Sequence, residues 1–69
     1  MTNTALLEKV INDSGLKREF IAEKCGITRQ SLTSKINNRN LFTAKEIGVL
    51  CDVLNITDLQ RKEEIFFAI

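Results

Sequence analysis

Apolar side chains recur every three to four residues along the whole chain, and no stretch alternates apolar and polar residues as a β-strand does. Segments rich in Gly, Asn, Ser or Thr interrupt this helical period at short intervals. The pattern predicts an all-α fold of short helices joined by short loops. Five helices are expected, over about residues 4–13, 17–25, 28–36, 43–54 and 57–67.

Residues suited to helix ends mark these boundaries. Gly15 and Gly26 follow the first two helices, and each is expected to adopt the left-handed conformation of a C-terminal cap. Thr28 is placed to cap the N-terminus of the third helix. Two further pairs have the spacing of a capping box, and Phe42 with Ile47 has the spacing of a hydrophobic staple. The capping-box pairs are Thr43 with Glu46 and Thr57 with Gln60.

The apolar stripes of the helices predict the core. The third helix should turn Leu32 and Ile36 inward, and at least one of Phe66 and Phe67 should pack against Leu50 or Leu54. The remaining predicted core residues are Leu7, Val10, Ile11, Phe20, Ile21, Cys25, Cys51 and Ile65.

The length of 69 residues, 7.8 kDa, predicts one small domain over residues 1–69. No Rossmann fold or β/α barrel fits in so short a chain. A content of 43% hydrophobic and 28% charged residues is typical of a globular rather than a disordered protein. Because neither a membrane-spanning stretch nor a secretory leader is visible, the protein is expected to be cytoplasmic.

The residue types that enzymes use are scarce. The chain has no histidine, so the commonest general base and metal ligand is missing. Cys25 and Cys51 lie 26 positions apart, a spacing that fits neither a CxxC pair nor a zinc knuckle. Buried thiols are the favoured interpretation, with a disulfide or redox pair as the alternative. We expect no enzymatic activity, no cofactor and no metal.

The net charge of +1 is small, but it is unevenly distributed. Residues 1–40 carry seven basic and four acidic side chains, a net charge of +3. Residues 41–69 carry three basic and five acidic side chains, a net charge of −2. The distribution is compatible with a basic face on one side of the molecule.

Residues 17–36 have the pattern of a helix-turn-helix unit. Ala22 is small enough for a second helix to cross closely over it, and Gly26 can adopt the positive φ of a sharp turn. Ile27 and Leu32 then follow at positions that fill the angle between the two helices. The spacing Ala-x3-Gly-Ile-x4-Leu meets all of these requirements.

The outward face of the third helix carries side chains that can bind the edges of DNA bases. Arg can bind guanine, Gln can bind adenine, and Ser or Thr can bind either base. No acidic residue lies between Thr28 and Asn40, so nothing in this segment would repel phosphate. The candidate base contacts are Thr28, Arg29, Gln30, Thr33 and Ser34.

The motif IAEKCGITRQSLTSKINN, followed by FTAKEIGVLCDVLNI and a terminal IFF, resembles the phage Cro/C1 repressor-type helix-turn-helix family. The resemblance covers residues 4–67. It implies a compact lambda-repressor-like domain, and a small prophage regulator that binds a double-stranded DNA operator through the recognition helix 28–36. It also implies that the candidate base contacts named above lie where this family meets bases.

The resemblance further implies contacts to the DNA backbone. Arg18 stands where the family contacts a phosphate, although many members have Gln there. Asn37, Asn38 and Arg39 match the loop after the recognition helix, and Asn38 is expected to be left-handed. Lys35 is a further candidate for a backbone contact. It occupies a commonly apolar position, which leaves Ile36 as the buried residue.

The expected partners are an operator and a second copy of the chain. One small module contacts too little DNA for high specificity, so a weak homodimer formed mainly on DNA is expected. One of Phe66 and Phe67 would stay exposed in its interface. The alternative is a protein-interaction module on the same fold, antitoxin-like or antirepressor, that binds its partner at the Phe66–Phe67 end. No small-molecule ligand is expected.

Overall fold

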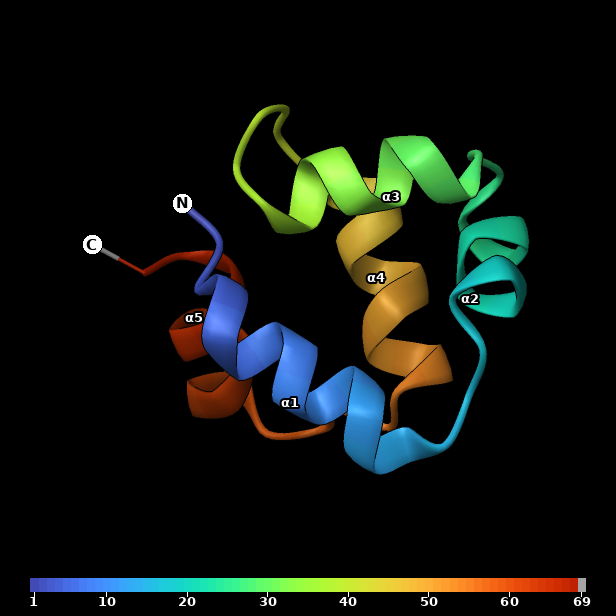
Figure 1. Ribbon diagram of the computed structural model, residues 1–69. Helices are drawn as coiled ribbons and strands as arrows, with labels where there is room; N and C mark the ends of the chain where they lie inside the picture. Colours follow the sequence, from blue (N-terminus) through green and yellow to red (C-terminus); the bar gives the residue numbers. More distant parts are fainter. Residues whose placement is uncertain (69) are drawn as a thin grey trace.

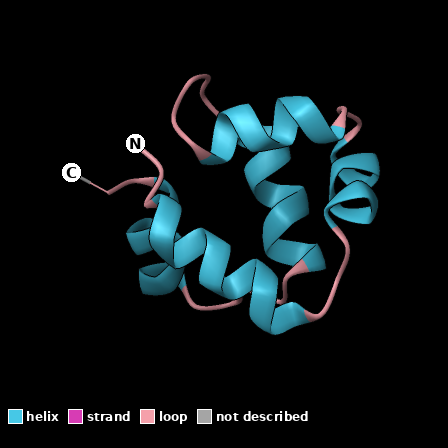
Figure 2. Cartoon of the chain, in the orientation of Figure 1, coloured by secondary structure: helices cyan, strands magenta, loops and turns pink. Residues whose placement is uncertain are grey.

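The computed structural model describes residues 1–68 and contains five α-helices, with no β-strand in that part of the chain (Figures 1 and 2). The helices are α1 (Thr4–Ser14), α2 (Arg18–Cys25), α3 (Arg29–Ile36), α4 (Ala44–Val53) and α5 (Leu59–Phe66). The all-α, five-helix prediction is confirmed, and each helix begins and ends within two residues of its predicted position.

The helices surround α4. In Figure 1, α3 crosses the N-terminal end of α4, and α2 packs against both. α1 packs against α3 and α5 on the other side. The radius of gyration is 10.6 Å, close to the ~11 Å expected for a compact chain of this length.

Most helix ends are capped by the residues that the sequence predicts. Gly15 and Gly26 have φ of 72° and 73°, so both are left-handed as expected. The Thr28 hydroxyl accepts the Ser31 N–H at 3.0 Å, which confirms this N-cap. The capping box of α4 is also confirmed: the Thr43 hydroxyl accepts the Glu46 N–H at 3.2 Å, and the Glu46 carboxylate accepts the Thr43 N–H at 2.9 Å.

The predicted capping box at the start of α5 is wrong. Asp58, not Thr57, is the N-cap, and its carboxylate accepts the Gln60 N–H at 3.0 Å. An ionised carboxylate gives a stronger hydrogen bond than a hydroxyl and also favours the positive end of the helix dipole. The helix therefore begins one residue later, at Leu59.

All five helices contribute to one hydrophobic core. Phe66 is buried in it with Leu50 and Leu54, whereas Phe67 is 56% exposed, which confirms the expected division between the two rings. Phe42 packs edge-on to Phe66 with ring centroids 5.7 Å apart. The other core residues are Leu7, Ile11, Ile21, Ala22, Leu32, Ile36, Ile47 and Ile65.

The prediction that Phe20 belongs to the core is wrong. Its side chain is 42% exposed, and the Lys24 ammonium lies 5.3 Å from its ring centroid. α2 is a short helix that directs only a narrow face inward, and Ile21 and Ala22 occupy that face. Val10, Cys25 and Cys51 pack against the core but are only partly buried.

Residues 1–4, the N-terminal strap, join the ends of α3 and α5. The Thr4 hydroxyl donates to the Ile36 carbonyl at 2.6 Å, and the Asn3 N–H donates to the Ile65 carbonyl at 2.7 Å. The Ala68 N–H donates to the Met1 carbonyl at 2.9 Å. Because of these contacts, the N-terminal strap lies between the C-terminal end of α3 and the end of α5 (Figure 1). None of the helices within residues 1–68 has the length and apolar character needed to cross a membrane.

Candidate nucleic-acid interface

The turn between α2 and α3 is held by backbone hydrogen bonds. The Gly26 N–H donates to the Glu23 carbonyl and the Ile27 N–H to the Ala22 carbonyl, both at 3.0 Å. The left-handed Gly26 makes this pattern possible because a Cβ would be strained at its φ. Only three residues thus separate the end of α2 from the start of α3, and α3 is held at a fixed angle to α2.

α3 divides into a buried face and an exposed one. Leu32 and Ile36 are at most 1% exposed, so they hold the helix against the core. Gln30 and Thr33 are exposed away from this buried face, Arg29 is exposed at its flank and Thr28 at the N-terminus of the helix, and Ser34 is partly buried. One surface therefore brings these side chains together, with Ser34 at its edge.

Two arginines near this surface have carboxylate partners on neighbouring helices. Arg29 Nη1 lies 2.9 Å from Glu19 Oε1, and both side chains are about 60% exposed. Arg18 Nη2 lies 3.8 Å from Glu8 Oε2, and Arg18 is 26% exposed. An exposed pair of this kind contributes only ~0.2–1 kcal/mol, so Arg29 can exchange Glu19 for another acceptor at little cost.

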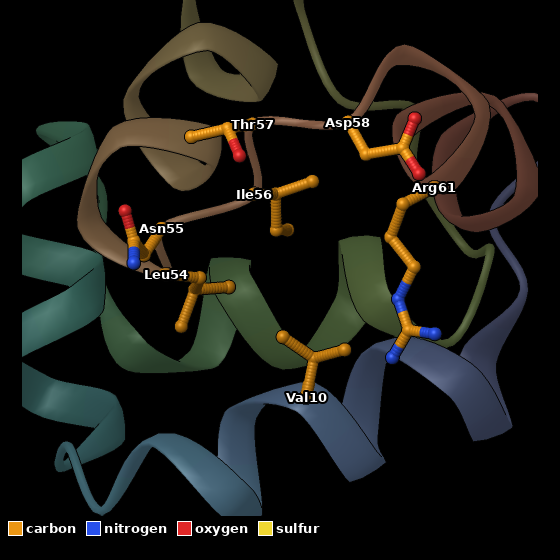
Figure 3. Close-up of a pocket in the computed structure, with 7 residues that line it drawn as sticks. All are labelled: Val10, Leu54, Asn55, Ile56, Thr57, Asp58 and Arg61. Carbon is orange, nitrogen blue, oxygen red and sulfur yellow. The ribbon is translucent and has the colours of Figure 1, made fainter.

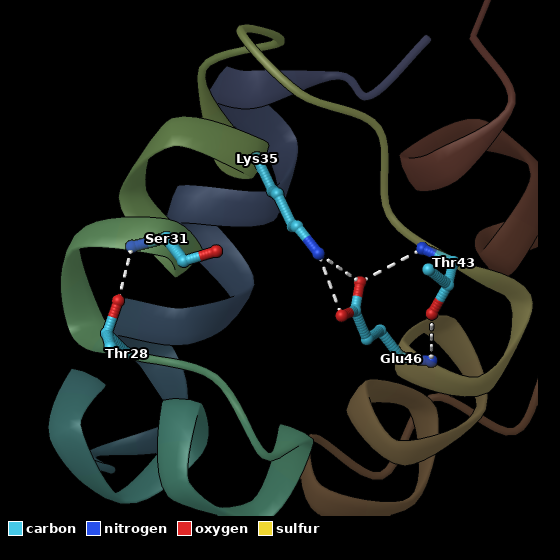
Figure 4. A network of polar contacts seen from close by, with 5 residues as sticks. All are labelled: Thr28, Ser31, Lys35, Thr43 and Glu46. Atoms are coloured by element: carbon cyan, nitrogen blue, oxygen red, sulfur yellow. Dashed lines mark hydrogen bonds and ion pairs between the residues drawn. The ribbon is translucent and has the colours of Figure 1, made fainter.

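Lys35 does not lie with the other candidate residues. Its Nζ donates to both carboxylate oxygens of Glu46, at 2.7 and 2.8 Å, and the two side chains are only 14% and 10% exposed (Figure 4). The predicted contact between Lys35 and the DNA backbone would require this pair to break. The reason is tertiary packing, because α4 brings Glu46 next to the end of α3.

The Glu46 carboxylate stays ionised in this partly apolar setting. Burial alone would raise its pKa, but hydrogen bonds from Lys35 and the Thr43 N–H, together with the Lys35 charge, hold the pKa below the ordinary value. Figure 4 shows the carboxylate between these two donors. The carboxylate therefore remains charged at neutral pH.

The loop after α3 contains three exposed residues, and the side chain of one of them, Asn38, is hydrogen-bonded within the protein. Asn38 is left-handed as predicted, with φ of 63°. Its side-chain amide accepts the Thr2 N–H and donates to the Thr2 carbonyl, both at 2.8 Å, so it is engaged within the protein. Asn37 and Arg39 are exposed beside it. Their predicted backbone contacts would break no side-chain bond found within residues 1–68.

Sequence reasoning missed the structural roles of Glu46 and Thr2. Glu46 carried a local signal as part of a capping box, but its partner Lys35 lies eleven residues earlier on another helix. Thr2 lies 36 residues from Asn38, and no spacing rule links them. Both contacts come from packing between segments distant in sequence.

Two hollows open on other parts of the surface. Figure 3 shows the first, of about 270 Å³, between α1 and the loop before α5, where Arg61 extends over α1 beside Val10. The second, of about 240 Å³, is mostly apolar and contains Met1, Leu41 and Phe67 at its exposed edge. Within residues 1–68 no three potential metal-ligating side chains cluster.

The two cysteines are free thiols in the structure. Burial raises the pKa of Cys25, with a further increase from the nearby Glu46 charge, and burial also raises the pKa of Cys51. Thiols with raised pKa are poor nucleophiles. Their setting agrees with the interpretation of both as partly buried apolar side chains rather than a disulfide.

Comparisons of the chain with protein-family models, with curated proteins and with solved structures found no match. The exposed face of α3 gathers donors and acceptors that suit base edges, on a helix fixed by its buried face and by the turn that precedes it.

Proposed function

We propose that this protein is a sequence-specific, double-stranded DNA-binding transcriptional regulator, in which α2 and α3 form a helix-turn-helix of the lambda-repressor-like type. One observation carries the proposal: α3 leaves Arg29, Gln30 and Thr33 exposed, while Leu32 and Ile36 anchor the helix to the core. Residues 28–40 contain no carboxylate that would repel DNA.

α3 has the dimensions to enter a major groove. An α-helix with its side chains is about 10–12 Å across, and the groove is about 12 Å wide. The N-terminal half of a recognition helix meets the bases, so Arg29 and Gln30 are the principal base contacts. Thr28 and Thr33 flank them, and Ser34 has a smaller role because it is partly buried.

Contacts to the DNA backbone come from the two ends of this surface. Arg18 lies at the start of α2, and Asn37 and Arg39 lie in the exposed loop after α3. We leave Lys35 and Asn38 out of this set because their polar atoms already bind Glu46 and Thr2. The protein would occupy an operator in the cytoplasm and block access of the polymerase.

A second copy of the chain is part of the proposal. Met1, Leu41 and Phe67 are 71%, 79% and 56% exposed around one apolar hollow, beside the C-terminal end of α3. Stable interfaces bury about 800 Å² per partner, with roughly 20–30 residues a side, and three exposed apolar side chains are only a small part of that. We therefore expect a weak homodimer. DNA would stabilise it, because the two half-sites of an operator would each bind one copy of the chain.

The same apolar patch favours a second candidate function, in which the fold binds another protein as an antitoxin-like or antirepressor module. The patch does not include the base-contact side chains of α3. Replacement of Arg29 would then leave binding intact, whereas replacement of Phe67 would remove it.

Selection from a random duplex DNA library tests the primary proposal. The selected duplex and a scrambled control are titrated with the full chain by fluorescence anisotropy at two salt concentrations. A roughly palindromic site that binds ~10³-fold or more tightly than the scramble would support an operator-binding dimer. Weak binding to both duplexes that salt abolishes equally would overturn the proposal, because only phosphate attraction would remain.

A further inference from the structure

The ion pair between Lys35 and Glu46 joins the last turn of α3 to the first turn of α4 (Figure 4). The two carboxylate oxygens of Glu46 accept hydrogen bonds from the Lys35 ammonium, at 2.7 and 2.8 Å. The carboxylate accepts a third hydrogen bond from the Thr43 N–H, at 2.9 Å. Both side chains are at least 86% covered. Lys35 is therefore confined to an internal position.

Extension of Lys35 to a phosphate would leave Glu46 as a covered carboxylate with the Thr43 N–H as its remaining donor. An unpaired charge in such a place is strongly unfavourable, whereas one exposed contact to phosphate returns little. The pair is thus expected to persist when DNA is bound. Arg39, which is exposed and has no ion-pair partner within residues 1–68, is better placed for that contact.

The C-terminal end of α3 is also hydrogen-bonded on its other side, to the N-terminal strap. Asn38 exchanges two hydrogen bonds with Thr2, and the Thr4 hydroxyl binds the Ile36 carbonyl. The buried anchors of α3, Leu32 and Ile36, hold the helix against the core, and rotation about its axis would displace them too. The off-axis bonds on the two flanks resist such rotation.

Rotation of α3 matters for base recognition. A side chain about 5–6 Å from the helix axis moves by about 2 Å when the helix turns by about 20°. Hydrogen bonds to bases tolerate only a few tenths of an ångström around 2.7–3.2 Å. A small rotation would therefore disconnect Arg29 and Gln30 from their bases.

We infer that Lys35 and Glu46 are positioning residues for DNA recognition, an inference that rests on the DNA-binding function proposed above. Their ion pair fixes the rotation of α3 on α4, and Lys35 neutralises Glu46 rather than a phosphate. The specificity of the protein depends on this pair, whereas its salt dependence does not.

Duplex binding by variants of the full chain distinguishes a lysine that positions α3 from a lysine that binds a phosphate. The variants are K35Q, E46Q, the double variant K35Q/E46Q, and R39Q as the matched phosphate-contact control. Each is titrated with the selected duplex and its scramble over a series of salt concentrations. R39Q should weaken binding to both duplexes alike and lower the salt slope by about one.

K35Q and E46Q should behave differently from R39Q. We expect each to lower the ratio of specific to scrambled binding by about tenfold or more, the loss of one well-placed base contact, with the salt slope unchanged. The double variant should be no worse than the worse single variant, since both remove one interaction. A slope reduced by about one in K35Q, with an unchanged ratio in E46Q, would overturn the inference.

Hydrogen exchange provides a readout that does not need DNA. The Asn37 and Arg39 amides donate to the Thr33 and Ser34 carbonyls at 3.1 and 2.9 Å. They should exchange about tenfold faster in E46Q, while the Leu7 amide of α1 keeps its rate as an internal reference. E46Q keeps its side-chain volume and leaves a lysine that can extend to water, so it is the variant best suited to remain folded.

The two proposals fail in different ways. If wild-type protein shows no preferred duplex, the DNA-binding function is overturned; faster exchange in E46Q would still support the positioning of α3 by the pair. If wild-type protein selects an operator but the Asn37 and Arg39 amides exchange at wild-type rates in E46Q, the positioning inference is overturned and the DNA-binding function stands.

Discussion

Asn38 binds the main chain of Thr2 through two hydrogen bonds of 2.8 Å, although 36 residues separate them in the sequence. The bonds connect the loop after α3 to the N-terminal strap, which in turn binds the end of α5. One side chain thereby links the proposed DNA-binding helix to both ends of the chain.

Loss of the Asn38 amide should destabilise the fold. Each hydrogen bond contributes about 0.5–1.5 kcal/mol, so N38G, which tolerates the φ of 63°, should lower the free energy of unfolding by about 1–3 kcal/mol. N38A should lower it by about 1 kcal/mol more, because alanine is strained in the left-handed region. Urea denaturation measures both. Equal stability of wild type and N38G would contradict a role for the two bonds.

Removal of the Glu19 carboxylate should strengthen DNA binding. In the free protein Glu19 holds Arg29 at 2.9 Å, and DNA must compete with it. E19Q should raise the affinity for the selected duplex about two- to fivefold, the equivalent of one exposed pair. E23Q, which removes the same charge from an exposed position of α2, is the control. Equal gains in E19Q and E23Q would point to net charge rather than to the release of Arg29.

The Glu46 carboxylate should make stability depend on acid pH. Its folded-state pKa lies below the ordinary value. Its contribution is therefore fully present above the unfolded-state pKa of about 4.3. The contribution is lost as the pH falls through the lower folded-state pKa. The urea midpoint of wild type should therefore decrease more steeply than that of E46Q below about pH 4.3. Parallel decreases in the two proteins would show that Glu46 is not responsible.

Two adjacent phenylalanines should respond in opposite ways to truncation. F66A removes a core ring and should cost about 3–5 kcal/mol, as much as the whole stability of many small domains, so the variant should be largely unfolded. F67S alters an exposed ring and should change stability by no more than about 0.5 kcal/mol. Sedimentation with operator DNA should show that, once one copy of F67S is bound, a second copy binds more weakly than it does in the wild type. Full cooperativity in F67S would place the dimer contact elsewhere.

The sequence alone predicted the helices and most of their ends. The left-handed Gly15 and Gly26 and the capping box of Thr43 with Glu46 involve residues at most four positions apart. Local spacing encodes such features because the interacting groups meet as soon as the helix forms. The error at Thr57 and Asp58 arose because two adjacent residues could each cap α5, and spacing alone does not rank a hydroxyl against a carboxylate.

The tertiary structure decided which polar side chains of the candidate site are free. Lys35 and Asn38 are residue types that commonly bind DNA. In the fold, however, Lys35 is paired with Glu46 of α4, and Asn38 is hydrogen-bonded to Thr2 of the N-terminal strap. Phe20 likewise follows the helical period but lies outside the face that the core covers. Helical periodicity determined which residues share a face. The partner of that face, and so the availability of each side chain, depends on distant segments that only the folded chain brings together.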